Sequence, residues 1–143
     1  MWTADVVLGC ALVLLGRSVI SFPPIEFVST LPAGASPGVE AYVRLNDPRI
    51  YLVTTSLHFR LLQRAKDRCA DLESARKLAS VLIHEETHLK YGADESRAYY
   101  AQLTTLTALG SGIGTPPYLE VVRAMRQALP RRKKPEGVIA AAN

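Results

Sequence analysis

The chain has 143 residues, which is enough for one compact domain and hardly enough for two. Its hydrophobic fraction of 48% is sufficient for a core. The net charge of +4 is misleading, because four of the 17 basic residues lie in Arg131–Lys134 and one of the 13 acidic residues is Glu136. The remainder holds 13 basic and 12 acidic groups. A domain so close to neutral argues against nucleic-acid binding.

Residues 1–21 form an apolar N-terminal segment that allows two interpretations. The apolar run Val6–Gly16 has 11 residues, which suits the core of a signal peptide better than a membrane span of about 20 residues. Asp5 precedes the run and no basic residue does, which is unlike a signal peptide. We prefer a signal or membrane anchor, and hence an exported or membrane-associated protein over a cytoplasmic one. A buried N-terminal helix is the alternative.

Residues 22–48 are rich in proline and glycine and read as a linker or irregular segment. Within it, residues 39–45 alternate between apolar and polar side chains, which predicts a short strand. Asn46-Asp47-Pro48 is a turn signal. Residues 49–55 follow as the strongest predicted strand, because they are dense in β-branched and aromatic residues. The two strands therefore predict an antiparallel hairpin.

Ser56 is predicted to cap a helix that ends near Arg68. The side chains expected on its inner face are Leu57, Leu61, Leu62 and Ala65. His58 in its first turn is interpreted as a surface or capping histidine, not as a metal ligand. Cys10 and Cys69 are too few for a disulfide framework and form no Cys-x-x-Cys pattern. A disulfide between the two is the alternative if the protein is exported.

Residues 74–91 predict the central helix, because this stretch lacks proline and glycine and carries an apolar stripe. The stripe consists of Ala75, Leu78, Ala79, Leu82 and Leu89. Asp71 or Ser74 can cap its N-terminus, and Gly92 stands where the helix should end. The three residues before His84 are all apolar and point to different sides of the helix. This indicates that the helix is buried on most sides.

The most informative motif of the chain, His84-Glu85-Glu86-Thr87-His88, lies in this helix and reads His-Glu-x-x-His. Its two imidazoles are one turn apart, about 6 Å along the axis, so both can bind one zinc ion. Glu85 borders the metal face and can accept a proton from a metal-activated water. Buried histidines and glutamates need partners, and a metal ion supplies them.

A catalytic zinc site usually takes three protein ligands, so a third is expected nearby. A turn after Gly92 leads into a second helix, 94–109, with Asp94 near its N-cap and Glu95 in its first turn. We predict Glu95 as the third ligand and keep Asp94 as the alternative. In a third interpretation both carboxylates only cap the helix. Tyr99, one turn after Glu95, is the candidate donor to an oxyanion, with aromatic packing as the alternative.

Beyond a Gly- and Pro-rich break at 110–117, a last helix is predicted over 117–129. Residues 130–143 are interpreted as a basic flexible tail. A contact of this tail with an anionic membrane or a nucleic acid is the alternative.

The motif His84-Glu85-x-x-His88, followed by a glycine and by Glu95-x-x-Ala98, resembles the zincin metallopeptidases and is closest to the gluzincin-like branch. The third histidine of the metzincin extension is absent. The resemblance covers about residues 74–102, and the gap between His88 and Glu95 is shorter than is common in large gluzincins. It implies Zn²⁺ as cofactor and a peptide or protein as substrate. It also suggests that strand 49–55 is an edge strand that pairs with substrate, with an ordinary internal strand as the alternative.

Together these features predict a mostly helical α+β fold, in which a short antiparallel sheet from residues 39–55 packs on the helix 74–91. The metallopeptidase-like domain would span residues 39–129. The predicted function is a zinc-dependent peptidase with Glu85 as general base. A non-catalytic metal-binding module and a helical interaction domain with an incidental motif are the alternatives.

Overall fold

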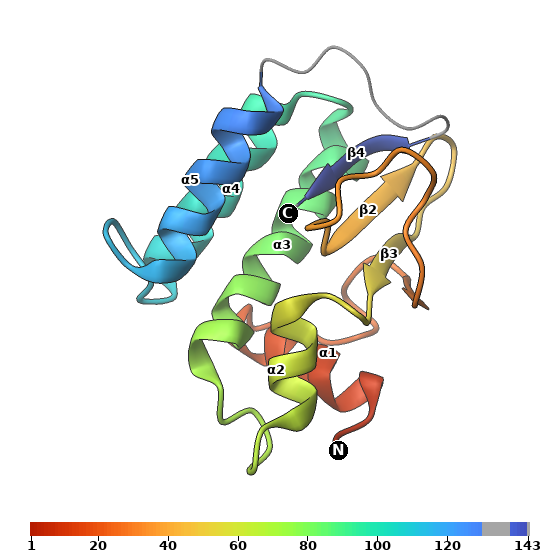
Figure 1. The fold of residues 1–143 in the computed structure, drawn as a ribbon. Coiled ribbons are helices and arrows are strands. Elements are labelled where there is room, and N and C mark those ends of the chain that lie inside the picture. Colours follow the sequence, from red (N-terminus) through yellow and green to blue (C-terminus); the bar gives the residue numbers. More distant parts are fainter. Residues whose placement is uncertain (130–137, 143) are drawn as a thin grey trace.

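The computed structural model describes residues 1–129 and 138–142 (Figure 1). The fold is α+β and mostly helical, as predicted. Its elements in chain order are α1 (Ala4–Leu14), β1 (Ile25–Val28), β2 (Ala41–Arg44), β3 (Ile50–Val53), α2 (Leu57–Arg64), α3 (Leu72–Tyr91), α4 (Glu95–Ala108), α5 (Pro116–Ala128) and β4 (Val138–Ala142). The basic run 131–134 lies outside the described residues.

The strands form one mixed sheet in the order β1-β3-β2-β4. The predicted hairpin is confirmed, since β2 and β3 pair antiparallel with Tyr42 opposite Tyr51. Two strands were not predicted: β1 pairs parallel with β3, and β4 pairs antiparallel with β2. β3 therefore has a neighbour on each side, and the idea that it is a substrate-binding edge strand is wrong. The prediction of a flexible tail is also wrong for residues 138–142, which pair with β2.

Helix α1 belongs to the main hydrophobic core. It buries Val7, Leu8, Cys10, Ala11 and Leu12. A disulfide joins Cys10 to Cys69, with 5.4 Å between their Cα atoms. The buried-helix interpretation thus describes how this segment packs, and the core extends beyond the predicted domain 39–129 to include α1 and β1. Within the described part of the chain, no helix has the length and apolar character needed to cross a membrane.

Helix α3 runs through the middle of the molecule, with α4 and α5 on one side and the sheet on the other (Figure 1). It also contacts α1 and α2. Its ends are where the sequence predicted them: the Asp71 side chain accepts from the Ser74 N–H at 3.0 Å, and Gly92 ends the helix with a φ of 86°. A glycine suits this position because other residues rarely adopt a positive φ. Being surrounded, α3 buries polar as well as apolar side chains.

Helix α2 is shorter than predicted and presents a different face to the core. Leu57 and Leu61, predicted to face inward, are 61% and 42% exposed. The buried residues are His58, Phe59 and Leu62. The helix turns this face inward because Phe59 packs edge-on against Phe27, and because His58 bonds to the buried Ser74 of α3 and to the half-buried Glu120 of α5. His58 is therefore a buried histidine and not a surface one.

Candidate metal centre

Two helices bring three potential metal ligands together. His84 and His88 lie one turn apart on α3, and Glu95 is the first residue of α4. Glu95 Oε1 lies 3.1 Å from His84 Nε2 and 2.7 Å from His88 Nε2. The two Nε2 atoms are 3.2 Å apart. Within the described residues this is the one group of three or more such side chains whose ligand atoms converge within 4.8 Å.

The chain reverses tightly between the two helices, and this reversal places Glu95. After Gly92 the chain turns, and the Asp94 carboxylate accepts from the Arg97 N–H at 3.1 Å and so caps α4. Capping fixes the direction of α4 and points its first residue back toward His88. Asp94 itself is exposed and lies outside the ligand cluster. The structure thus separates the two carboxylates that the sequence left as alternatives.

A chain of buried hydrogen bonds orients the His84 ring. The Ser80 hydroxyl donates to the Lys77 carbonyl at 2.7 Å, so it accepts from Gln102 Nε2 at 3.2 Å. The amide oxygen of Gln102 then faces His84 Nδ1 at 2.8 Å. Since this oxygen only accepts, His84 must carry its proton on Nδ1. Gln102 was missed by sequence reasoning, although it follows Glu95 by two helical turns and so falls on the same face.

His88 is held in the same way by the main chain. Its Nδ1 lies 2.8 Å from the Gly92 carbonyl oxygen. Because a carbonyl oxygen can only accept a hydrogen bond, Nδ1 must carry the proton. Both rings therefore present the Nε2 lone pair to the same point as a carboxylate oxygen of Glu95. Such fixed tautomers are typical of histidines that ligate metals.

The surroundings also favour the charge states that a metal requires. Burial lowers the pKa of His84, and this outweighs the raising effect of Glu95. For Glu95, burial raises the pKa, but the close contact with the His84 and His88 rings outweighs it and lowers the pKa to about 2. Metal ions bind neutral imidazoles and ionised carboxylates, so these are the protonation states that a metal site requires.

The residues fit a zinc ion. Bonds of about 2.0–2.1 Å in a tetrahedron separate the ligand atoms by about 3.3 Å. The separations of 2.7, 3.1 and 3.2 Å between the three atoms are close to this value. Two imidazole nitrogens and one carboxylate oxygen are a donor set that zinc accepts. Without a cation, two lone pairs and a negative oxygen would face one another.

The other motif residues lie around this cluster. Glu85 is fully buried beside His84 on α3. Tyr99 packs its ring edge-on against the His84 ring, with the centroids 4.5 Å apart. This contact is the aromatic packing foreseen for Tyr99, and its role as an oxyanion donor stays a prediction. Glu86 pairs with Arg17 at 2.7 Å and so connects the segment after α1 to α3, a contact that sequence reasoning missed.

A groove borders the cluster at His88 and Gly92. Its other walls are Pro23, Pro24 and the turn 44–48 between β2 and β3, and it encloses about 530 Å³. The ligands themselves are covered: the side chains of both histidines are 0% exposed and that of Glu95 is 12% exposed. Of the three ligand residues, His88 alone lines this groove.

No protein-family model, curated protein or solved structure matches the chain. The functional assignment therefore depends on the geometry of the cluster and on the motif that forms it.

Proposed function

We propose that the protein is a zinc-dependent peptidase whose metal is held by His84, His88 and Glu95. The observation that carries the proposal is the convergence of both Nε2 atoms and one Glu95 oxygen, with each Nδ1 atom bonded to an acceptor. A zinc ion in this position would activate water and polarise a substrate carbonyl group.

Glu85 is the proposed general base. It follows His84 directly, so its carboxylate is carried on the same turn of α3 as the ligands without being one of them. In this role it takes a proton as water attacks the carbonyl carbon, and then passes that proton to the leaving amine. Tyr99 is the proposed second donor to the oxyanion, since its ring lies against His84.

Three protein ligands support a catalytic site, because a fourth position stays available for water or substrate. Asp94, the alternative third ligand in the sequence analysis, instead caps α4 and lies outside the ligand cluster. The burial of the ligands favours a second candidate, a metal site without turnover, since only Glu95 is measurably exposed. In that case zinc would stabilise the fold and take no part in catalysis.

The test is a comparison of zinc content and peptide hydrolysis in the parent chain and in Glu85→Gln. We expect near one zinc per chain in both proteins, and a fall in hydrolysis of an unfolded protein substrate of at least about 100-fold in the variant. Glu73→Gln is the matched control, because Glu73 lies on the same helix and is exposed.

The outcomes separate the candidates. Zinc without hydrolysis in the parent would favour the non-catalytic metal site. Full activity of Glu85→Gln would contradict its role as general base. A parent that binds no zinc after incubation with the metal would contradict both candidates and leave a helical domain with an incidental motif.

A further inference from the structure

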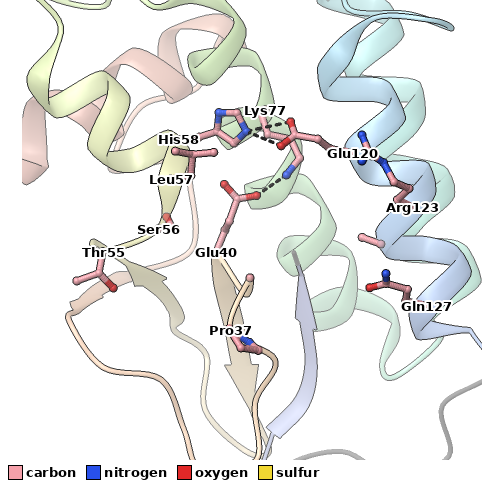
Figure 2. Close-up of a pocket in the computed structure, with 12 residues that line it drawn as sticks. Pro37, Glu40, Thr55, Ser56, Leu57, His58, Lys77, Glu120, Arg123 and Gln127 are labelled. Carbon is pink, nitrogen blue, oxygen red and sulfur yellow. Dashed lines mark hydrogen bonds and ion pairs between the residues drawn. The ribbon is translucent and has the colours of Figure 1, made fainter.

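A second polar cavity lies on the N-terminal half of α3, away from the ligand cluster. It is lined by the segment before β2, the start of α2, α3 and α5, and has a volume of about 370 Å³ (Figure 2). The polar residues that line it include Glu40, His58, Lys77, Glu120, Arg123 and Gln127. We call it the Glu40 cavity. Its volume lies within the range of small-molecule sites.

Two pairs of acidic and basic side chains cross this cavity. Lys77 Nζ pairs with Glu40 Oε2, and both residues are buried. His58 Nε2 lies 3.0 Å from Glu120 Oε2, while its Nδ1 lies 2.9 Å from the Ser74 hydroxyl. The cavity thus contains two carboxylates and two bases that face one another, and it is not a simple anion or cation site.

One buried atom in this arrangement lacks a hydrogen-bond donor. Glu40 is 4% exposed, and within the described part of the chain its Oε1 has no hydrogen-bond partner. Figure 2 shows this carboxylate with one oxygen directed at Lys77 and the other turned away from it. A buried carboxylate oxygen without a donor is costly, because its desolvation is not compensated. It therefore marks a place where a ligand N–H group is favoured.

The wall formed by α5 carries the Glu120 carboxylate and, further along the helix, two side chains with hydrogen-bond donors. Arg123 is exposed at the rim and Gln127 follows one turn later, so both reach the cavity from the same helix face (Figure 2). A guanidinium with an adjacent amide is suited to bind a carboxylate. The cavity therefore offers an acceptor inside and donors at its rim.

We propose that the Glu40 cavity binds a free α-amino acid, with its ammonium group donating to Glu40 Oε1 and its carboxylate bound by Arg123. The site uses none of the three metal ligands, so it does not depend on the peptidase proposal.

The test is an amide NMR titration of the full chain with L-alanine. We expect shifts at Leu57, His58 and Gln127 and none at Glu95. Ethylamine and propionate each carry one of the two charges of alanine, and we expect each to bind at least about tenfold more weakly. Arg123→Ala should weaken alanine binding by at least about tenfold, while Arg126→Ala, an exposed arginine outside the cavity, should leave it unchanged.

Several results would overturn the proposal. One is the absence of shifts at the cavity residues in a large excess of alanine. Shifts confined to Glu95 and its neighbours would place the amino acid at the metal centre instead. If the parent bound ethylamine as tightly as alanine, the ligand carboxylate would contribute nothing to binding. If Arg123→Ala bound alanine as tightly as the parent, Arg123 would not bind that carboxylate. Because Arg123 is exposed, its replacement tests the site without disturbing the core.

Discussion

Helix α3 contributes to two groups of ionisable side chains, and the two groups differ in how their members are paired. On its N-terminal half, Lys77 pairs with Glu40, and His58 of α2 pairs with Glu120 of α5. There each acid faces a base. On its C-terminal half, two imidazoles with fixed tautomers and one carboxylate direct lone pairs at a single point. The first group pairs each acid with a base, whereas the second would need a bound cation to pair its lone pairs.

The largest expected effect comes from breaking the first group. Lys77→Met would leave Glu40 buried without its cation and should destabilise the fold by about 3–5 kcal/mol, because the remaining carboxylate loses its compensation. The free energy of unfolding from urea titrations measures this loss.

The double variant Glu40→Leu with Lys77→Met is the control for that prediction. Since it removes both charges, its stability should be close to that of the parent. A single variant as stable as the parent would mean that the pair is not buried as described, and would weaken the contrast between the two groups.

Zinc should stabilise the protein through the second group. At a free zinc concentration about 100 times the dissociation constant, binding to the folded state adds about 2.7 kcal/mol. Removing the metal with a chelator should reverse the gain, and His88→Ala should abolish it. Thermal unfolding with and without zinc is the measurement.

His58→Ala is the matched control, because His58 is the third histidine of the chain and lies outside the cluster. It should keep the zinc-dependent rise in unfolding temperature even if its own stability is lower. An equal rise in His88→Ala and the parent would show that zinc binds elsewhere.

A smaller effect is expected at Gln102, which touches the cluster only through His84. Gln102→Leu removes the acceptor that keeps the proton on His84 Nδ1, and zinc affinity should fall about 10- to 100-fold. Competition with a zinc-binding dye measures this change. Gln102→Glu, which retains an acceptor oxygen, should keep more of the affinity, and Gln127→Leu should keep all of it. Equal affinities in all four proteins would contradict the positioning role of Gln102.

The C-terminal group could be predicted from the sequence because it is local. His84 and His88 are one turn apart, and Glu95 follows after a turn whose glycine and capping Asp94 are readable in the sequence. Helical periodicity and capping residues are short-range signals, and they gave the bounds of α3 and α4 within about two residues.

The features that were missed depend on contacts between distant residues. His58 and Glu120 are 62 positions apart, and no pattern in either helix indicates the pair. β1 and β4 become strands through pairing with β3 and β2, and neither shows a clear alternation of its own. The inward face of α2 was wrong for the same reason, since Phe27 and Ser74 decide it.

The smallest predicted effect is the loss of the stabilisation by Glu120 at low pH. Burial raises the pKa of this carboxyl group, but the hydrogen bond from His58 and the charges of Lys77 and Arg123 outweigh it, so the pKa lies below 4.5. A lowered pKa in the folded state means that the carboxylate adds stability above pH 4.5, and that this stability is lost as the pH falls through the folded-state pKa. Glu120→Gln should therefore unfold at a lower temperature than the parent above pH 4.5.

The difference between Glu120→Gln and the parent should shrink as the pH is lowered further, because the parent carboxyl is then protonated as well. Its size is modest, since the side chain is 35% exposed and solvent screens its charge. Unfolding temperatures across this pH range measure it, with the exposed Glu73→Gln as control for the loss of one negative charge on the surface. If this difference in unfolding temperature did not change with pH, the negative charge of Glu120 would not contribute to stability. The contact between His58 and Glu120 would then stabilise the fold through packing alone.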